Sequence, residues 1–312
     1  MVPKSVSMLL WLACAVPAPG AQPAAPHGEF RDCDGCPEMV VVPAGSFVIG
    51  SPAGERDRAS SEGPQRRVQV GAAFAVGKYE ITRAQFAEFS RAVAARPQAD
   101  GCLAFDPSDA DFRRDASGRD WRRPGYPQTD DHPAVCIAWT EAKSYADWLS
   151  TKTGQRYRLL SESEWEYAAR AGSGSSRPWG DDPAQSCRHA NLADETFVRE
   201  VSRGPRGSWY PGWHACRDGY AHTAPVGRYQ PNRFGLHDMI GNAWEWVEDC
   251  WNDSHALASS DASPRLAGDC ASRVYRGGAW HSYPRFGRSA QRSGAAAGYR
   301  HALIGFRVAR AL

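Results

Sequence analysis

The sequence predicts a loop-rich α+β fold, on three observations. The chain of 312 residues contains 30 Gly and 22 Pro, which favour turns and interrupt regular elements. Its 12 Trp supply many large core anchors, a pattern unlike that of a helical bundle. Short β-branched runs stand beside three amphipathic helical patterns. With 42% hydrophobic and 23% charged residues, the composition is that of an ordinary globular chain, which disfavours disorder and a multi-span membrane protein.

The charge balance argues against a nucleic-acid partner. The formal net charge is only +2, and the basic residues are spread along the chain instead of forming a patch. The length would suit about two domains, although single α+β domains of this size are common.

The N-terminus predicts a signal peptide over residues 1–21. Lys4 precedes an apolar run over residues 8–16, and small residues and prolines follow it. The run is too short to cross a bilayer, so no membrane span is expected. One alternative is an ordinary N-terminal helix. A second is that Cys14 is a lipid-attachment site, although Trp11 stands where a lipobox usually has Leu. We therefore expect a secreted or periplasmic protein.

The remaining cysteines predict disulfides. Beyond the signal peptide they are Cys33, Cys36, Cys102, Cys136, Cys187, Cys216, Cys250 and Cys270, an even set suited to an oxidising compartment. Sequence permits 105 pairings of eight cysteines, and sequential pairing is the simplest hypothesis. A redox role for the first pair is the sharper alternative, but no thioredoxin-like strand and helix follow it. Residues 22–37 are then a linker that carries a disulfide, and residues 38–312 form the main domain.

The first elements of that domain are predicted to be strands. Residues 39–50 form two β-branched runs around a Pro-Ala-Gly turn, which predicts a hairpin. Residues 51–67 are polar and charged and are expected to form an exposed loop. Residues 68–79 alternate again in the manner of a strand.

Three helices are predicted next. Thr82 caps the first, which Pro97 ends, and a second begins at Thr140 and ends at Gly154. The third begins at Ser161, whose hydroxyl forms a capping box with Glu164. Their inward faces carry Phe86, Phe89, Val93, Ala142, Tyr145, Trp148, Leu149, Trp165, Ala168 and Ala169, most simply as core residues. Beyond residue 171 the chain is irregular and rich in Gly, Pro, Asp and Asn, so it needs disulfides or metal ions to hold it.

Seven ordered segments together resemble the formylglycine-generating enzyme family, also called sulfatase-modifying factors. They span roughly residues 38–311, an order that chance does not explain. The resemblance implies one compact domain with a C-type-lectin-like core. The segments are residues 39–47 (MVVVPAGSF), 79–82 (YEIT), 132–135 (HPAV), 158–170 (RLLSESEWEYAAR), 234–246 (FGLHDMIGNAWEW), 276–280 (RGGAW) and 305–309 (GFRVA).

The resemblance also implies two structural calcium sites. Calcium prefers carboxylate, amide and backbone carbonyl oxygens. The first site would use the side chains of Asn191 and Asp218 with the carbonyls of Leu192 and Tyr220, held by a disulfide between Cys187 and Cys216.

The second calcium site implied by the resemblance lies at Gly241, Asn242, Ala243 and Glu245. Glu245 would supply its carboxylate, with main-chain oxygens nearby. Glu245 stands between two tryptophans and is otherwise an awkward charge to bury. The alternative is that Glu245 pairs with an arginine.

The loop that follows residue 276 departs from the family's oxidases. There, a serine and two cysteines follow Arg-Gly-Gly, and the cysteines bind copper and activate oxygen to oxidise a substrate cysteine, because thiolates hold Cu(I). Here the serine position is Ala279, and the cysteine positions are Ser282 and Gly287. Copper-dependent formylglycine formation is therefore not expected.

The loop keeps other polar groups as candidate catalytic residues. His281 is a possible general base or lone metal ligand, and the arginines, Arg292 included, are possible clamps for an anionic or planar ligand. Salt bridges to Asp and Glu are the plainer role for those arginines. The candidates are His281, Ser282, Tyr283, Arg285 and Arg288.

Two functions remain open. The family also includes periplasmic relatives that lack the cysteine pair and act on siderophore precursors, and the chain resembles that branch. It lacks the helical iron-binding domain of the ergothioneine branch. The expected function is an oxidoreductase that tailors a peptide or peptide-like substrate, and the alternative is a non-catalytic binding module on the same scaffold.

Overall fold

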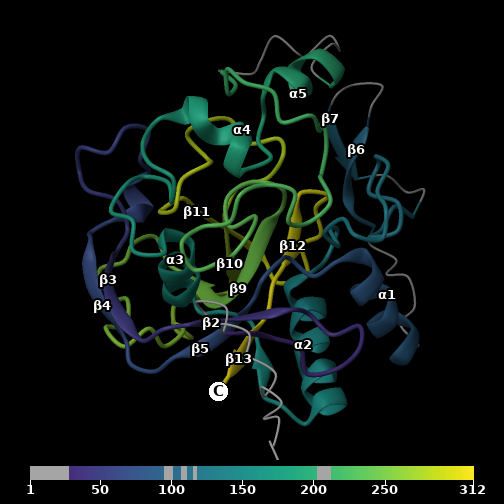
Figure 1. The fold of residues 1–312 in the computed structure, drawn as a ribbon, viewed down its shortest axis with the longest axis horizontal. Coiled ribbons are helices and arrows are strands. Elements are labelled where there is room, and N and C mark those ends of the chain that lie inside the picture. The colour runs from purple at the N-terminus through teal and green to yellow at the C-terminus, as the bar shows by residue number, and fades with distance from the viewer. Residues whose placement is uncertain (1–27, 95–100, 107–110, 115–117, 202–211) are drawn as a thin grey trace, which may run out of the picture.

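A computed structural model describes residues 28–94, 101–106, 111–114, 118–201 and 212–312. The predicted signal peptide over residues 1–21 and the predicted helix-ending Pro97 lie outside these ranges. The described chain is an α+β structure in which long irregular segments connect short strands and a few helices (Figure 1). The loop-rich α+β prediction is confirmed.

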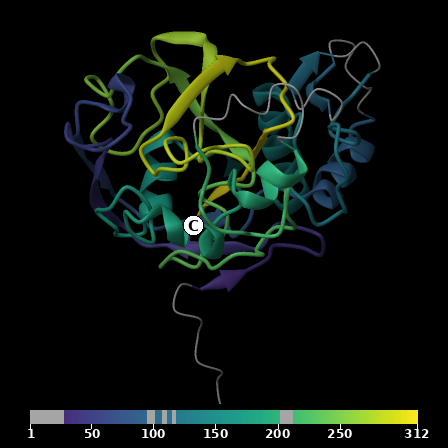
Figure 2. The ribbon, with the colours of Figure 1, turned by 90° about the horizontal axis from the view of Figure 1, so that it is seen from above.

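A five-stranded antiparallel sheet joins the two ends of the described chain. Its strands run in the order β1-β2-β5-β13-β8, so the C-terminal strand lies inside the sheet. Figure 2 shows β1 and β2, in purple, along one side of the molecule. The strands are β1 (Glu29–Phe30), β2 (Met39–Val42), β5 (Phe74–Gly77), β8 (Tyr157–Arg158) and β13 (Ala309–Ala311).

A second sheet has four strands. Its order is β11-β10-β9-β12, with only β12 parallel to its neighbour β9. Six of the eight residues of β9 are buried, and they point to both sides of the strand, as expected for a strand covered on both faces. The strands are β9 (Trp244–Trp251), β10 (Asp269–Arg276), β11 (Arg292–Ala296) and β12 (Ile304–Phe306).

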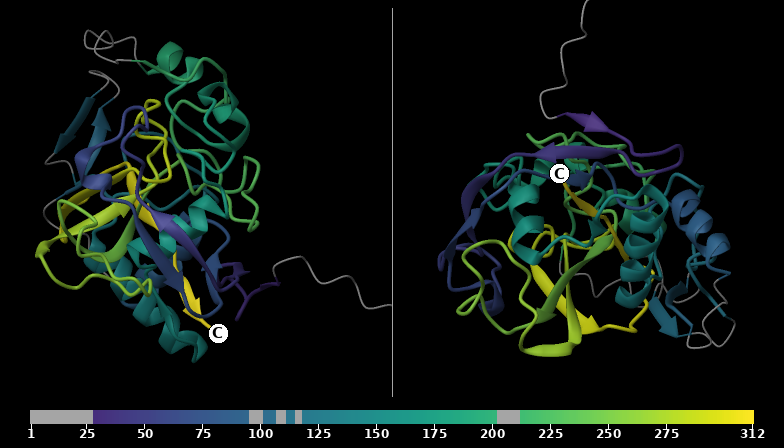
Figure 3. Two further views of the ribbon diagram at one scale, coloured as in Figure 1. Left: turned by 90° about the vertical axis from the view of Figure 1, so that its left-hand side faces the viewer. Right: turned by 90° about the horizontal axis from the view of Figure 1, so that it is seen from below.

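Three capped helices cover these sheets. Helix α1 (Arg83–Ala92) begins after Thr82, whose Oγ1 accepts from the Gln85 N–H at 3.3 Å. Helix α2 (Trp139–Thr153) packs against α1, β8 and β9, and helix α3 (Glu162–Arg170) packs against β9 and β10 (Figure 3). The Ser161 capping box and the left-handed Gly154 cap (φ 68°) are confirmed. Val93, predicted to face inward, instead caps α1 and is exposed.

The hairpin predicted over residues 39–50 is wrong. Strand β2 pairs with β1 and β5, whereas β3 (Gly45–Ile49) pairs with β4 (Arg66–Val70). The Pro-Ala-Gly segment therefore carries the chain from one sheet to another. The side chains of β2 are mostly buried and those of β3 alternate, so the two runs suit different environments.

Residues 51–67 are only partly the exposed loop that was predicted. A 3-10 turn (Ser60–Glu62) lies within them, and Glu62 is fully buried. The remaining short elements are the hairpin β6 (Leu103–Asp106) and β7 (Asp111–Arg114), the 3-10 turn Pro183–Gln185, and the helices α4 (Ser186–His189) and α5 (Glu195–Glu200).

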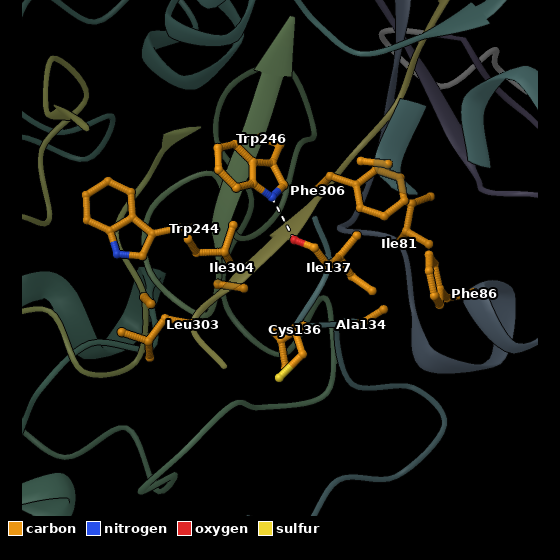
Figure 4. Close-up of a cluster of buried hydrophobic side chains, with 14 of the residues drawn as sticks. Ile81, Phe86, Ala134, Cys136, Ile137, Trp244, Trp246, Leu303, Ile304 and Phe306 are labelled. Atoms are coloured by element: carbon orange, nitrogen blue, oxygen red, sulfur yellow. Dashed lines mark hydrogen bonds between the residues drawn. The ribbon is translucent and has the colours of Figure 1, made fainter. Parts of the chain in front are cut away.

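The core is built mainly of aromatic and β-branched side chains from both sheets and the helices. Figure 4 shows Trp246 of β9 beside Ile137, Ile304 and Phe306, and its indole N–H donates to the Ile137 carbonyl at 2.8 Å. Such a bond satisfies the polar atom of a fully buried tryptophan. Among the described residues, no helix is long and apolar enough to span a bilayer.

Four disulfides tie the irregular segments together, in the sequential pairing that was predicted. They are Cys33–Cys36, Cys102–Cys136, Cys187–Cys216 and Cys250–Cys270. All eight cysteines beyond the predicted signal peptide are therefore oxidised in pairs.

Candidate functional site

The loop between β10 and β11 is anchored by a buried arginine. Arg276 is fully buried and forms ion pairs with Glu166 and, at 3.4 Å, with Glu162 of α3. It also donates to the carbonyls of Ser289 and Ala290 at 3.0 Å, which fixes the far end of the loop. The loop that carries the candidate residues is thus held rigidly at both ends.

Ser282 shapes this loop. Its Oγ accepts from the Ala279 N–H at 2.9 Å, and its own N–H donates to the Ala279 carbonyl at 2.7 Å. Its carbonyl accepts from the Ala193 N–H at 3.0 Å. Because the side chain is buried and its oxygen bonds a local turn, the structure gives Ser282 a positioning role.

The structure does not fit a thiolate copper site at the loop. Gly287 is buried, and a Cβ there would lie 3.0 Å from Leu192 Cδ1, so even a small side chain would press on that leucine. Within the described chain, every cysteine belongs to a disulfide. Soft thiolate ligands are therefore missing where the family's oxidases carry them.

Arg288 and Arg292 are ion-pair partners of buried glutamates. Arg288 contacts Glu62 and Glu55, each at 2.6 Å, and Arg292 contacts Glu162 at 2.7 Å. Burial alone would lower the pKa of Arg288, but hydrogen bonds and charge from Glu62 outweigh it and raise the pKa. Both arginines therefore have the plainer predicted role of forming salt bridges. The Arg288 guanidinium is occupied by glutamate side chains and does not act as a ligand clamp.

The other three candidates stay partly or fully exposed. Tyr283 stacks edge-on against Phe286 with ring centroids 4.7 Å apart, and the Arg285 guanidinium lies 5.0 Å from the centre of the same ring. His281 lies edge-on to Phe112 at 5.1 Å and to Phe197 at 5.9 Å. The structure thus separates His281, Tyr283 and Arg285 from the buried pair Ser282 and Arg288.

An aromatic–histidine cluster surrounds Trp280 and His281. Ring contacts link its members: His222 stacks on Tyr126 at 4.8 Å, and His301 lies 4.5 Å from Phe112. Sequence reasoning missed this cluster because its members come from segments that are distant in the sequence and share no motif. The members are Phe105, Phe112, Tyr126, Phe197, His222, Trp280, His281 and His301.

Burial keeps two of these imidazoles neutral. It lowers the pKa of His222 to about 4 and that of His301 to about 3, with the His281 charge adding to the shift at His301. These two imidazoles are therefore weak bases that stay uncharged and can form hydrogen bonds near neutral pH. The cluster thus combines aromatic surface with neutral hydrogen-bonding rings.

The residues at the first predicted calcium site fit a cation. The Oδ1 atom of Asn191 is buried and has no hydrogen-bond partner. Asp218 lies beside Asp194, whose Oδ2 accepts the Asp218 N–H at 2.6 Å. Burial and the Asp194 charge raise the pKa of Asp218 to about 8. A buried carboxylate beside a half-buried one, together with an unpartnered amide oxygen, is an arrangement that a divalent cation would stabilise.

The predicted backbone ligands of this site lie beside the same carboxylate. The N–H groups of Leu192 and Tyr220 donate to Asp218 at 3.3 and 2.8 Å, so both peptides are close to it. The Cys187–Cys216 disulfide joins the two segments, as predicted. Sequence reasoning missed Asp194. Its signal is that aspartate is a preferred residue before a helix, and Asp194 does cap α5 by accepting the Phe197 N–H at 2.8 Å.

At the second predicted calcium site, the structure shows the ion-pair alternative. Glu245 pairs with Arg307 at 2.7 Å and accepts from the Trp165 indole N–H at 2.8 Å. Asn242 and the Ala243 N–H donate to Glu80 at 2.7 and 2.9 Å. The carboxylate intended for calcium is thus already neutralised, so these residues fit an ion-pair network better than a calcium site.

Gly241, the remaining residue of that second site, brings the two predicted sites together. Its φ is +85°, and a Cβ there would lie 2.3 Å from the Asn191 carbonyl oxygen, so only glycine fits.

Within the described part of the chain, no three His, Cys, Asp or Glu side chains converge as a metal-binding cluster. A cation at the first site would therefore depend on amide and carbonyl oxygens as well as carboxylate.

The fold and this loop place the chain in a known family. Residues 27–312 match the family described as "Sulfatase-modifying factor enzyme 1-like domain", and the chain belongs to it. The family resemblance and the loop-rich α+β fold class expected from it are confirmed.

Relatives extend over almost the whole chain. It is 31% identical over 325 residues to the formylglycine-generating enzyme of Streptomyces coelicolor, covering 95% of this chain and 93% of the relative. It is 30% identical over 266 residues to the "Inactive C-alpha-formylglycine-generating enzyme 2" of Bos taurus, covering 78% and 76%. The solved structure of PvdO from Pseudomonas aeruginosa matches with 39% identity and a TM-score of 0.76, covering 93% of this chain and 100% of PvdO.

Proposed function

We propose that this chain is an extracytoplasmic oxidoreductase that tailors a peptide-like substrate without copper. The observation that carries the proposal is that some residues of the loop are buried and hold its shape, whereas others are partly exposed. Ser282 and Arg288 are buried and build the loop, whereas His281 and Tyr283 are partly exposed and His281 lies in the aromatic–histidine cluster. A rigid loop that presents an imidazole beside aromatic rings is suited to hold and deprotonate an aromatic substrate.

The proposed chemistry uses dioxygen as the electron acceptor. An electron-rich ring of the substrate, such as a catechol, stacks on the aromatic rings of the cluster, and His281 accepts its hydroxyl proton. The substrate loses two electrons and two protons and becomes a quinone. Dioxygen gains both and leaves as hydrogen peroxide, which balances the reaction without a bound metal.

An oxidising compartment supports the proposed location. Four disulfides close loops throughout the described chain, and such bonds persist in secreted and periplasmic proteins. The signal-peptide pattern over residues 1–21 points the same way. We therefore propose a periplasmic or secreted protein with a structural calcium ion at Asn191 and Asp218.

Oxygen uptake tests the proposed activity. Purified protein, freed of copper and supplied with calcium, is given a peptide that carries a catechol side chain, and oxygen consumption and peroxide formation are recorded. We expect one peroxide per oxygen consumed above the uncatalysed rate, and at least a tenfold lower rate for His281→Ala. The matched control His189→Ala, a histidine outside the cluster, should retain the wild-type rate.

The second candidate is a non-catalytic binding module. One observation favours it: Gly287 carries no reactive side chain in the family's cysteine position, and it packs against Leu192. The same assay separates the candidates. Peptide binding with no oxygen uptake above background, and no effect of His281→Ala on oxygen consumption, would establish the binding module and reject the oxidoreductase.

A further inference from the structure

A cavity of about 550 Å³ lies beside the candidate loop. Pro284 and Arg288 line one side, and residues of the segments 52–57 and 174–183 line the other. Its volume is within the range of small-molecule sites, about 300–1,000 Å³. The cavity is distinct from the aromatic–histidine cluster, since none of the cluster's rings lines it.

Arg177 is a buried cation in the wall of this cavity. It is only 5% exposed, and its Nη1 donates to Ser176 Oγ at 3.3 Å and to the Asp181 carbonyl at 3.2 Å. Its Nη2 donates to the Pro284 carbonyl at 2.9 Å, but its Nε has no hydrogen-bond partner. No described carboxylate lies within ion-pair distance of Arg177, so its charge is buried without a direct counter-ion.

The other charged groups of the cavity wall have partners. Glu55 pairs with Arg288 at 2.6 Å, and Asp57 pairs with Arg56 at 3.7 Å. Asp181 accepts the Ser176 N–H at 2.7 Å. Leaving a buried charge unpaired is costly. Among these lining residues, Arg177 is therefore the one that an anionic ligand would stabilise most, by supplying the missing counter-charge.

We propose that this cavity binds a carboxylate group of the peptide-like ligand through the Arg177 guanidinium. The peptide-like class of the ligand is taken from the proposed function. The binding itself does not depend on the proposed reaction with oxygen. Arg177 lines the cavity, and a guanidinium presents adjacent N–H donors that match a carboxylate. Glu55, Asp57 and Asp181 would repel a dianion, so a singly charged carboxylate fits better than phosphate.

Titration with a minimal probe tests the proposal. N-acetyl-triglycine, its C-terminal carboxamide and inorganic phosphate are each titrated into the whole protein and followed by calorimetry and by the arginine Nε–H resonances. We expect the free carboxylate to bind at least tenfold more tightly than the carboxamide or phosphate, and to shift one Nε–H resonance. Arg177→Gln should weaken binding of the carboxylate at least tenfold, whereas the rim control Arg56→Gln should change it less than twofold.

Equal binding of carboxylate and carboxamide, tighter binding of phosphate, or equal losses in the two arginine variants would overturn the proposal. If Arg177→Gln does not fold, the Nε–H shift in the wild-type protein decides the matter: its presence supports the site and its absence rejects it. The assay needs no turnover, so a carboxylate site without oxygen uptake would keep this inference and reject only the oxidoreductase.

Discussion

Arg288 and Arg285 belong to one loop but have different surroundings. Arg288 is buried between Glu62 and Glu55, whereas Arg285 is exposed and lies over Phe286. A buried cation with two carboxylate partners is expensive to remove, because both carboxylates are left without a counter-ion. An exposed arginine on an aromatic ring contributes little.

Arg288→Gln should therefore lower the free energy of unfolding by about 3–5 kcal/mol, the usual cost of breaking a buried pair. Arg285→Gln, the matched control, should change it by less than about 0.5 kcal/mol. Chemical denaturation measures both. Equal effects of the two substitutions would contradict the structural role of Arg288.

Glu162 makes stability depend on acid pH. Burial alone would raise its pKa, but the charges of Arg292 and Arg276 outweigh burial and lower the pKa from 4.5 to about 2. Because the folded pKa lies below the unfolded one, the stabilisation is complete above pH 4.5 and is lost as the pH falls towards 2.

Glu162→Gln should then be less stable than the wild type at pH 6, and the difference should shrink at pH 3. Denaturation at the two pH values measures the gap. Glu200→Gln, at an exposed glutamate, should show the same small difference at both. A gap for Glu162→Gln that does not change with pH would rule out the linkage.

At the scale of elements, capping fixes where the helices begin. Ser161 caps α3 through the Glu164 N–H at 3.0 Å, and its hydroxyl also donates to the Ala262 carbonyl at 2.6 Å. The cap therefore joins the helix to a loop about a hundred residues away in sequence. Losing both bonds removes more than an ordinary cap would contribute.

Ser161→Ala should lower the free energy of unfolding by about 2 kcal/mol, the upper end of the range for a cap. Ser144→Ala, an exposed serine inside α2, is the matched control and should be neutral or slightly stabilising. Thermal or urea unfolding distinguishes the two. A neutral Ser161→Ala variant would mean that the cap contributes nothing.

The segments that carry Asn191 and Asp218 should be stabilised by calcium. In chelator-treated protein, added calcium is expected to raise the melting temperature by several degrees, because it offsets the repulsion between Asp194 and Asp218. Asp218→Asn should abolish most of that increase, and the exposed control Asp147→Asn should leave it intact. An unchanged melting temperature on chelation of the wild-type protein would refute the calcium site.

Local features of the whole molecule could be predicted from the sequence, and long-range ones could not. The caps at Thr82, Ser161 and Gly154 depend on residues within a few positions of one another, and the structure has all three. Arg288 and Glu62 lie 226 residues apart, so no local pattern announces their pairing. The predicted pairing of β2 with β3 failed for the same reason. A short Pro-Ala-Gly segment resembles a hairpin turn whichever sheets its two strands join.

The candidate site shows the same division. The family segments located the loop and the positions of the absent cysteines, while His222, His301 and Tyr126 reach the aromatic–histidine cluster only through the fold. The scaffold thus brings together a site whose parts are scattered over the chain.

Cu(I) titration of the whole protein, followed by exposure to a cysteine-containing sulfatase peptide, tests the central claim most directly. Since Ser282 and Gly287 stand in the cysteine positions and every cysteine of the described residues is paired, we expect no stoichiometric Cu(I)–thiolate absorption and an unchanged peptide cysteine. One equivalent of Cu(I) bound through thiolate, together with conversion of the peptide cysteine to an aldehyde, would contradict a copper-free function for this chain.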